Sequence, residues 1–241
     1  MASGGLSHFR VDEELDAEVV VGPYTVIGAG VQIGRGPSVG AHCVIQGSTA
    51  IGRENRIFQF SSLGADPQDM KYRGEPTRLE IGDRNTIREF CTFNRGTAQD
   101  AGVTRLGNDN WVMAYVHLAH DVQVGHQTIL ANNATLAGHV HVGDWAILSG
   151  YCGVHQFCKI GTHAFMANNS AATRDVPPFV MAAGAPAEPK GINAEGLKRR
   201  GYTSDQVANI KAAYKDGILE VRIPMSTTKA KQERIPIAHK S

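Results

Sequence analysis

The chain has 241 residues, of which 42% are hydrophobic and 20% are charged, a composition typical of a folded globular protein. Lysine and arginine total 24 and aspartate and glutamate total 23, so the charge gives no reason to expect nucleic acid or a membrane surface as a partner. No apolar run is long enough to span a bilayer, and no charged-then-apolar leader opens the chain. We therefore expect a cytoplasmic protein with no membrane span.

A bulky aliphatic residue stands at every sixth position near the start of the chain. Neither an amphipathic helix nor an alternating strand has this period, and a hexapeptide repeat is typical of a parallel β-helix. Glycine directly follows six of these positions, where we expect it to relieve backbone strain at turns between flat sides. The repeated positions are Leu15, Val21, Ile27, Ile33, Val39, Ile45, Ile51, Ile57 and Leu63.

Two stretches break the period. The first, at about 64–80, carries Pro67, Gly74 and Pro76 among several charged residues, and the second covers 94–105. Neither can form a coil of the repeat, so we expect both to loop out. Loops on a rigid solenoid commonly carry function, and we predict that these two do.

The period returns and is unbroken from Leu106 to Met166. A mostly small residue stands two positions before each large aliphatic, on the same face of a strand. Each hexad therefore points one large and one small side chain inward, and three hexads make a coil of eighteen residues. The cysteines occupy such inward positions, so we expect buried thiols, with neither disulfides nor a metal site. They are Cys43, Cys91, Cys152 and Cys158.

The eighteen-residue coil gathers several histidines on one edge. A neutral histidine is a natural general base at physiological pH, and Asp121 is placed to fix the tautomer of His120. The backbone N–H of Gly138, one coil further on, is the kind of donor that stabilises an oxyanion. The predicted column and its neighbours are His117, His120, Gly138, His139, His155 and Gln156. We expect the other corner histidines to face solvent without a function: His126, His141 and His163.

The repeat ends after Met166, and prolines mark an irregular exit. We predict a β-helix domain over 1–190 and a short helical region over 191–241 that ends in an extended or disordered tail.

Two helices are expected in the second region. The first covers Ala194 to Arg200 and ends at Gly201. The second begins at Thr203, whose spacing to Gln206 is a capping-box pattern, and ends at Gly217.

Six long motifs follow one another along about residues 18–215. They are GEPTRLEIGDRNTIRE (74–89), HLAHD (117–121), ILANNATLAGHV (129–140), VHQF (154–157), DVPPFV (175–180) and GLKRRG (196–201). Together they closely resemble the UDP-N-acetylglucosamine O-acyltransferase family of lipid A synthesis. The resemblance implies a left-handed β-helix, a homotrimer with active sites between subunits, and no cofactor or metal. It also implies transfer of a 3-hydroxyacyl group from acyl carrier protein to the 3-OH of UDP-N-acetylglucosamine.

The resemblance further implies roles for individual residues. His120 would be the general base, Asp121 would orient it, and the Gly138 N–H would hold the thioester oxyanion. Transfer would be direct, since no serine or cysteine stands beside the base. Asn193, Glu195 and Arg200 would hold the nucleotide, and Arg199 would help with the carrier arm. The implied substrate-binding residues are Gln68, Asp69, Lys71, His117, His139, His155, Gln156, Asn193, Glu195, Arg199 and Arg200.

Three features depart from the family pattern. Asn94 precedes Arg-Gly-Thr where the family usually has histidine, which leaves the acceptor sugar open. Asn168 stands where some members have glycine at the end of the acyl pocket, so we expect a shorter acyl chain. The family's C-terminal helical domain is longer, and we expect the similarity to fade after about Lys215.

Three other functions stay open. One is the related N-acyltransferase, or an acyltransferase acting on a UDP-diamino sugar; the GEPTR and GLKRRG motifs argue against the N-acyltransferase. A carbonic-anhydrase-type β-helix would hold zinc with three histidines and leave one position for water. A non-enzymatic β-helix would present only a surface, and gives no reason for the histidine column.

Overall fold

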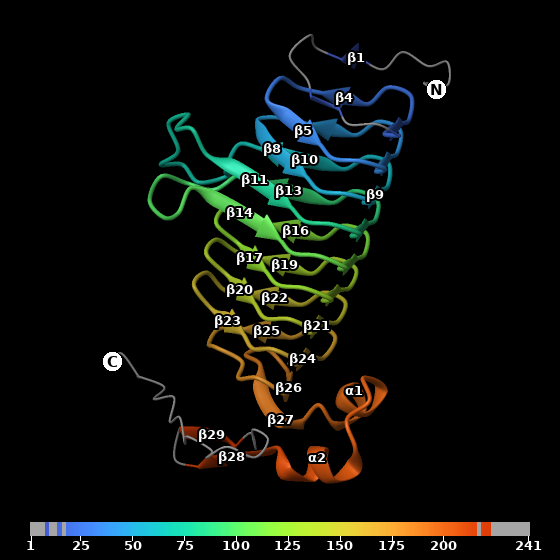
Figure 1. The fold of residues 1–241 in the computed structure, drawn as a ribbon. Coiled ribbons are helices and arrows are strands. Elements are labelled where there is room, and N and C mark those ends of the chain that lie inside the picture. Colours follow the sequence, from blue (N-terminus) through green and yellow to red (C-terminus); the bar gives the residue numbers. More distant parts are fainter. Residues whose placement is uncertain (1–7, 10–13, 16–17, 216–217, 223–241) are drawn as a thin grey trace.

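The computed structural model describes residues 8–9, 14–15, 18–215 and 218–222. Through residue 183 the described chain winds as a left-handed parallel β-helix, a rod of stacked coils with three flat sides (Figure 1). The predicted fold is therefore confirmed. The tail expected over 223–241 lies outside the described residues.

Each flat side is a sheet whose neighbouring strands come from successive coils. Sheet 1 consists of β1 (His8–Phe9), β4 (Val26–Ile27), β7 (Val44–Ile45), β10 (Ser62–Ala65), β13 (Thr92–Asn94), β16 (His117–Leu118), β19 (Thr135–Leu136), β22 (Gly153–Val154) and β25 (Ala171–Ala172). Sheet 2 consists of β2 (Glu14–Leu15), β5 (Val31–Ile33), β8 (Ser48–Ile51), β11 (Arg78–Ile81), β14 (Val103–Leu106), β17 (Gln123–Val124), β20 (His141–Val142) and β23 (Lys159–Ile160). Sheet 3 consists of β3 (Val20–Val21), β6 (Ser38–Val39), β9 (Arg56–Ile57), β12 (Thr86–Ile87), β15 (Trp111–Val112), β18 (Ile129–Leu130), β21 (Ile147–Leu148), β24 (Phe165–Met166), β26 (Val180–Ala183) and β27 (Glu188–Ile192).

Strand register confirms the eighteen-residue coil and its inward pattern. Val26 pairs with Val44, and His117 pairs with Thr135, one coil further on in each case. The hexad aliphatics fill the interior, and Leu136 is fully buried. Burial of apolar area at about 25 cal/mol per Å² makes this column the main source of stability. The four cysteines are free and buried, as predicted.

The glycines after the aliphatic positions have a different role from the one expected. Of the six, only Gly64 has a positive φ, 81°. A Cβ on Gly22 or Gly40 would instead lie 2.6 Å from a backbone nitrogen of the next coil. Positive φ falls on larger residues of the turns, such as Tyr24 and His42. Close approach between coils, and not turn strain, therefore requires glycine at Gly22 and Gly40.

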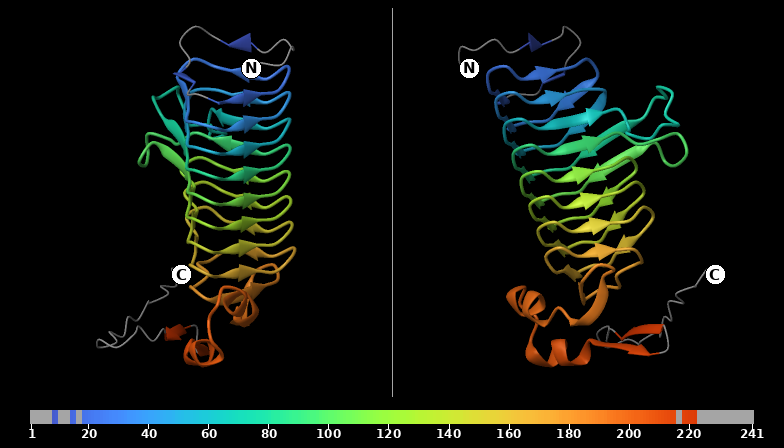
Figure 2. Two further views of the ribbon diagram at one scale, coloured as in Figure 1. Left: turned by 45° about the vertical axis from the view of Figure 1, so that its right-hand side comes forward. Right: turned by 180° about the vertical axis from the view of Figure 1, so that it is seen from behind.

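Three corners join the sheets, and we name each by the sheets it connects. Both predicted loops leave the rod at the 1–2 corner: residues 66–77 join β10 to β11, and residues 95–102 join β13 to β14. Figure 2 shows the two loops projecting on the same side of the rod. They are shorter than expected because their ends still pair in strands, as Ala65 does with Asn94. The fold thus brings two distant segments to one corner.

The C-terminal part begins with the antiparallel pair β26 and β27, followed by α1 (Ala194–Arg199) and α2 (Ser204–Asn209). The capping box of α2 between Thr203 and Gln206 is confirmed. The predicted extension of this helix to Gly217 is wrong, because β28 (Lys211–Lys215) and β29 (Ile218–Arg222) pair antiparallel. Neither helix of the described segments has the length and apolar character needed to cross a membrane.

An aromatic stack joins α1 to the β-helix at the 2–3 corner. His163 is only 7% exposed and lies between Trp145 and Phe179, at ring-centroid distances of 5.9 and 5.3 Å. The expectation that His163 faces solvent is therefore wrong. Arg200 donates to its Nδ1 at 3.3 Å, which leaves Nε2–H for Tyr202 Oη, also at 3.3 Å. Burial, with a contribution from the Arg200 charge, lowers the pKa of His163 to about 4.

This contact makes part of the stability depend on pH. Between the ordinary histidine pKa of about 6.5 and the folded value of about 4, the unfolded chain binds a proton that the folded chain excludes. Stability should therefore fall as pH drops through this window, by up to about 3 kcal/mol. His163→Phe keeps the stacking without the titration, so its free energy of unfolding should fall less steeply. Denaturant unfolding at pH 7 and pH 4.5 measures the difference. The exposed control His141→Phe should keep the wild-type slope, and an unchanged slope in His163→Phe would contradict the account.

Candidate active site

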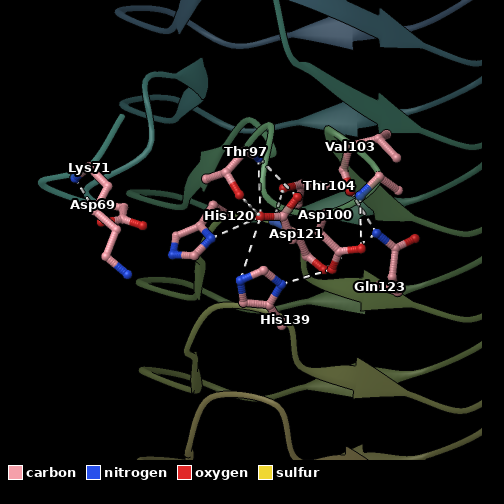
Figure 3. A network of polar contacts seen from close by, with 11 residues as sticks. Asp69, Lys71, Thr97, Asp100, Val103, Thr104, His120, Asp121, Gln123 and His139 are labelled. Carbon is pink, nitrogen blue, oxygen red and sulfur yellow. Dashed lines mark hydrogen bonds and ion pairs between the residues drawn. The ribbon is translucent and has the colours of Figure 1, made fainter. Parts of the chain in front are cut away.

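A histidine–carboxylate pair lies at the 1–2 corner, between β16 and β17 (Figure 3). His120 Nδ1 is 3.0 Å from Asp121 Oδ2. An ionised carboxylate only accepts hydrogen bonds, so Nδ1 carries the hydrogen and Nε2 is left to accept a proton. The His120 side chain is 16% exposed and that of Asp121 is 1% exposed. The pair is therefore a general base with a buried orienting group.

Loop 95–102 holds the carboxylate in place. The Thr97 N–H donates to both Asp121 oxygens at 2.9 and 3.1 Å, and Thr97 Oγ1 donates to Oδ2 at 2.6 Å. The Asp121 N–H in turn donates to Thr104 Oγ1 at 2.8 Å. A buried carboxylate needs such donors to stay ionised. Sequence reasoning missed both threonines, although loop 95–102 lies one coil before His120 at the same corner.

Gly138 lies directly against the His120 ring. A Cβ at this position would lie 2.4 Å from His120 Cε1 and 2.6 Å from Nε2. The imidazole therefore rests where any other residue would put its side chain. Within the described part of the chain, no protein acceptor pairs with the Gly138 N–H. This N–H is available to an oxyanion beside the base, as the sequence suggested.

Two further histidines surround the base. His139 stacks on Phe157 at 4.5 Å, meets His120 edge-on at 5.0 Å, and its Nδ1 lies 2.8 Å from Asp100 Oδ2. His117 Nδ1 lies 2.7 Å from the Thr92 hydroxyl, and burial lowers the pKa of His117. His117 is thus held uncharged at neutral pH. Two residues of the expected column, His155 and Gln156, are exposed at the same corner one coil beyond Gly138.

Loop 66–77 brings its expected residues to the open side of the base. Figure 3 shows Asp69 and Lys71 beside His120, on the side away from Asp121. The Lys71 N–H donates to Asp69 Oδ1 at 2.9 Å. Gln68 and Lys71 are exposed, and so are available to a ligand.

The two loops are tied to each other at their bases. Arg95 donates to the Gly64 carbonyl at 2.6 Å and forms an ion pair with Asp66. Asn94 is buried, and its Nδ2 donates to the Asp66 carbonyl at 2.8 Å. Asn94, singled out for the acceptor sugar, therefore has an anchoring contact between the loops.

The expected nucleotide-binding residues lie at a different corner from His120. Asn193 is buried at the start of α1, where it accepts from the Gly196 N–H at 3.1 Å and donates to the His163 carbonyl at 2.9 Å. Glu195 and Arg199 are exposed on α1. The Arg200 guanidinium lies 5.1 Å from the centre of the Trp145 ring.

Asn168, expected at the end of the acyl pocket, lies at the third corner. It follows β24 of sheet 3 and is exposed, and its Oδ1 accepts from the Gly150 N–H at 3.1 Å. One chain therefore brings together His117, His120, Gly138 and His139, but not the residues of α1 or Asn168.

The same cluster contains the described residues that could hold a metal. Ligand atoms of His120, Asp121 and His139 all lie within 4.8 Å of one another. However, both Asp121 oxygens already accept from Thr97. These hydrogen bonds fit a proton-transfer pair better than a metal centre.

A general base beside an unpaired backbone N–H can deprotonate a hydroxyl and stabilise the oxyanion of acyl transfer. On a β-helix of hexapeptide repeats, this site defines the class of hexapeptide acyltransferases. The sequence profile of the bacterial transferase hexapeptide (six repeats) matches residues 104–138. A second profile, described as "Udp N-acetylglucosamine O-acyltransferase; Domain 2", matches residues 175–233. The expectation that similarity fades after Lys215 is therefore wrong.

Relatives narrow the class further. The acyl-[acyl-carrier-protein]–UDP-N-acetylglucosamine O-acyltransferase of Herminiimonas arsenicoxydans is 60% identical over 217 residues, covering 90% of this chain and 82% of its own length. The UDP-N-acetylglucosamine acyltransferase structure from Francisella novicida aligns with a TM-score of 0.84 at 44% identity, over 86% of this chain and 76% of that one. The corresponding structure from Campylobacter jejuni aligns with a TM-score of 0.81 at 38% identity, over 84% and 79%. The chain belongs to the acyl-[acyl-carrier-protein]–UDP-N-acetylglucosamine O-acyltransferase family, and it is an acyltransferase.

Gly138→Ala tests the packing of the base against the backbone. The added methyl group would occupy space that the His120 ring fills, so the imidazole must move by about an ångström. A shift of that size costs about 100-fold in rate, and we expect acyltransferase activity to fall by this factor while the thermal midpoint changes little. Gly153→Ala is the matched control, because a Cβ there meets nothing within 4 Å. Wild-type activity in Gly138→Ala would show that the ring does not act from this position.

Proposed function

We propose that this protein transfers a 3-hydroxyacyl chain from acyl carrier protein to the 3-OH of UDP-N-acetylglucosamine, the first step of lipid A synthesis. The observation that carries the proposal is the His120–Asp121 pair against Gly138. Its support is that relatives about 60% identical over most of the chain are named for this donor and acceptor.

The proposed reaction is a direct transfer. His120 Nε2 takes the proton of the sugar hydroxyl as its oxygen attacks the thioester carbonyl carbon. The Gly138 N–H stabilises the oxyanion of the tetrahedral intermediate. The intermediate collapses with cleavage of the C–S bond, and the imidazolium returns its proton to the leaving thiolate. Asp121 keeps Nδ1–H in place throughout, because Thr97 fixes its carboxylate.

We further propose that the working enzyme is a homotrimer with its sites between subunits. The catalytic pair, the α1 residues and Asn168 lie near three different corners of one rod, whereas the proposed donor and acceptor, which meet at the base, must together reach all three. Packing corners of neighbouring copies together would bring the sets within reach, and cyclic symmetry with three copies suits a three-sided rod. Asn193, Glu195 and Arg200 would then hold the nucleotide, and Arg199 would help to hold the carrier arm. A cytoplasmic location stays a prediction.

The first test is acyl transfer from 3-hydroxyacyl carrier protein to UDP-N-acetylglucosamine by the wild-type protein and His120→Ala. Removing the base should lower the rate by about 10²–10⁴-fold without unfolding the protein. Arg53→Ala, an exposed residue near the N-terminal end of the rod, is the control.

Other outcomes of this assay select other functions. Transfer only to a UDP-2,3-diamino sugar would replace the hydroxyl acceptor by an amine. If the wild-type protein bound about one zinc ion per chain and His120→Ala bound none, the carbonic-anhydrase-type β-helix would be favoured.

Acyl chain length tests the part proposed for Asn168. If its side chain closes the end of the acyl pocket, Asn168→Gly should shift the preferred donor to longer chains. A series of 3-hydroxyacyl carrier proteins of increasing length measures kcat/KM for both proteins. The same chain-length preference in both would remove Asn168 from the pocket.

A further inference from the structure

A second histidine–carboxylate pair lies beside the first, and its carboxylate comes from loop 95–102, the loop that also holds Asp121. His139 Nδ1 is 2.8 Å from Asp100 Oδ2. The carboxylate can only accept, so Nδ1 carries the hydrogen of this ring. This hydrogen bond lowers the pKa of Asp100, which keeps the carboxylate ionised. The sequence motifs that pointed to His139 gave no indication of Asp100.

One turn of loop 95–102 serves both pairs. Thr97 donates its N–H and hydroxyl to Asp121, while its carbonyl accepts from the Asp100 N–H at 3.3 Å. The Ala101 N–H donates to Asp100 Oδ1 at 2.8 Å, which leaves Oδ2 for His139. The geometry of Asp100 is thus fixed by the turn that fixes Asp121. Figure 3 shows both carboxylates on the loop side of the two rings.

The remaining contacts of His139 restrict its ring to one orientation. Phe157 stacks on one face with the ring planes 9° apart, and the edge of His120 meets the ring at 84°. With Nδ1 bound to Asp100, Nε2 lies 3.9 Å from Asp121 Oδ2. The His139 side chain is 11% exposed, and the Asp100 side chain is 46% exposed. Nε2 is therefore the ring atom aimed at the catalytic pair.

We propose that Asp100 is a positioning residue of the acyl transfer, acting through His139. It keeps the hydrogen on Nδ1 and holds the ring so that Nε2 faces the His120–Asp121 pair and the substrate between the loops. This proposal rests on the proposed function. An exposed carboxylate contributes little to folding stability, so its removal separates positioning from stability.

The test is a double-mutant cycle on the full chain. Asp100→Gly should lower kcat/KM for acyl transfer about tenfold with little change in the thermal midpoint. Asp100→Asn keeps an acceptor for Nδ1–H and should recover most of the activity. In the His139→Ala background, Asp100→Gly should have no further effect, because contacting residues that act as a unit are not additive. Gln99→Gly, in the same loop and exposed, controls for added backbone freedom.

A second readout does not depend on activity. In protein carrying ¹⁵N-labelled histidine, side-chain NMR should show His139 as a single Nδ1–H tautomer in the wild type and a mixture of tautomers in Asp100→Gly. An unchanged His139 signal, or a tenfold loss that persists in the His139→Ala background, would overturn the proposal. Absence of transfer by the wild type would count against the proposed function alone, because the tautomer measurement still tests whether Asp100 keeps the hydrogen on Nδ1 of His139.

Discussion

Backbone hydrogen bonds between adjacent coils hold residues eighteen apart in columns, and the rest of the molecule depends on that register. The His139 N–H donates to the His120 carbonyl at 3.1 Å, and the Phe157 N–H donates to the Gly138 carbonyl at 3.1 Å. The backbone of the 1–2 corner therefore has the same hydrogen-bonding pattern in successive coils. Buried side chains inside the rod follow the same register. The Asn110 N–H donates to Asn85 Oδ1 at 2.9 Å, and the Thr128 N–H donates to Asn110 Oδ1 at 2.8 Å.

The rod supplies rigidity, and the loops supply the chemistry that a regular repeat lacks. A coil can place His120 against Gly138, but it has no buried donors to hold a carboxylate at a corner. Loop 95–102 provides them through Thr97, and Arg95 at its base anchors loop 66–77 through Gly64 and Asp66. Because both loops leave at one corner, the base has a fixed partner on one side and an open side for substrate.

The period of the sequence was enough to predict a parallel β-helix and the column of residues on its edge, whereas its left hand followed from the family resemblance. Hexad spacing determines which side chains point inward, and arithmetic on the coil brings His120, Gly138 and His139 together across distant parts of the chain. What it could not supply were contacts made by residues outside the repeat. Thr97 and Asp100 have no fixed position in a period, so only the loop's folded path shows that they face Asp121 and His139.

The errors at the C-terminal end have the same origin. His163 occupies a corner position that elsewhere faces solvent, and it is buried only because Phe179 and Tyr202 fold back onto it. The helix expected to reach Gly217 ends at Asn209, because an antiparallel pairing competes with it. In the first case a tertiary contact prevailed over a local pattern, and in the second the pairing of adjacent strands prevailed over a helical pattern.

The most direct test of the account is a crystal structure of His120→Ala with UDP-N-acetylglucosamine bound. The account predicts a trimer in which the sugar 3-OH lies over Gly138, within hydrogen-bonding distance of the space left by the imidazole, and the uridine lies against Arg200 of the partner subunit. A nucleotide held wholly by one chain, or a sugar 3-OH far from Gly138, would contradict the shared site and the role of His120 as its base.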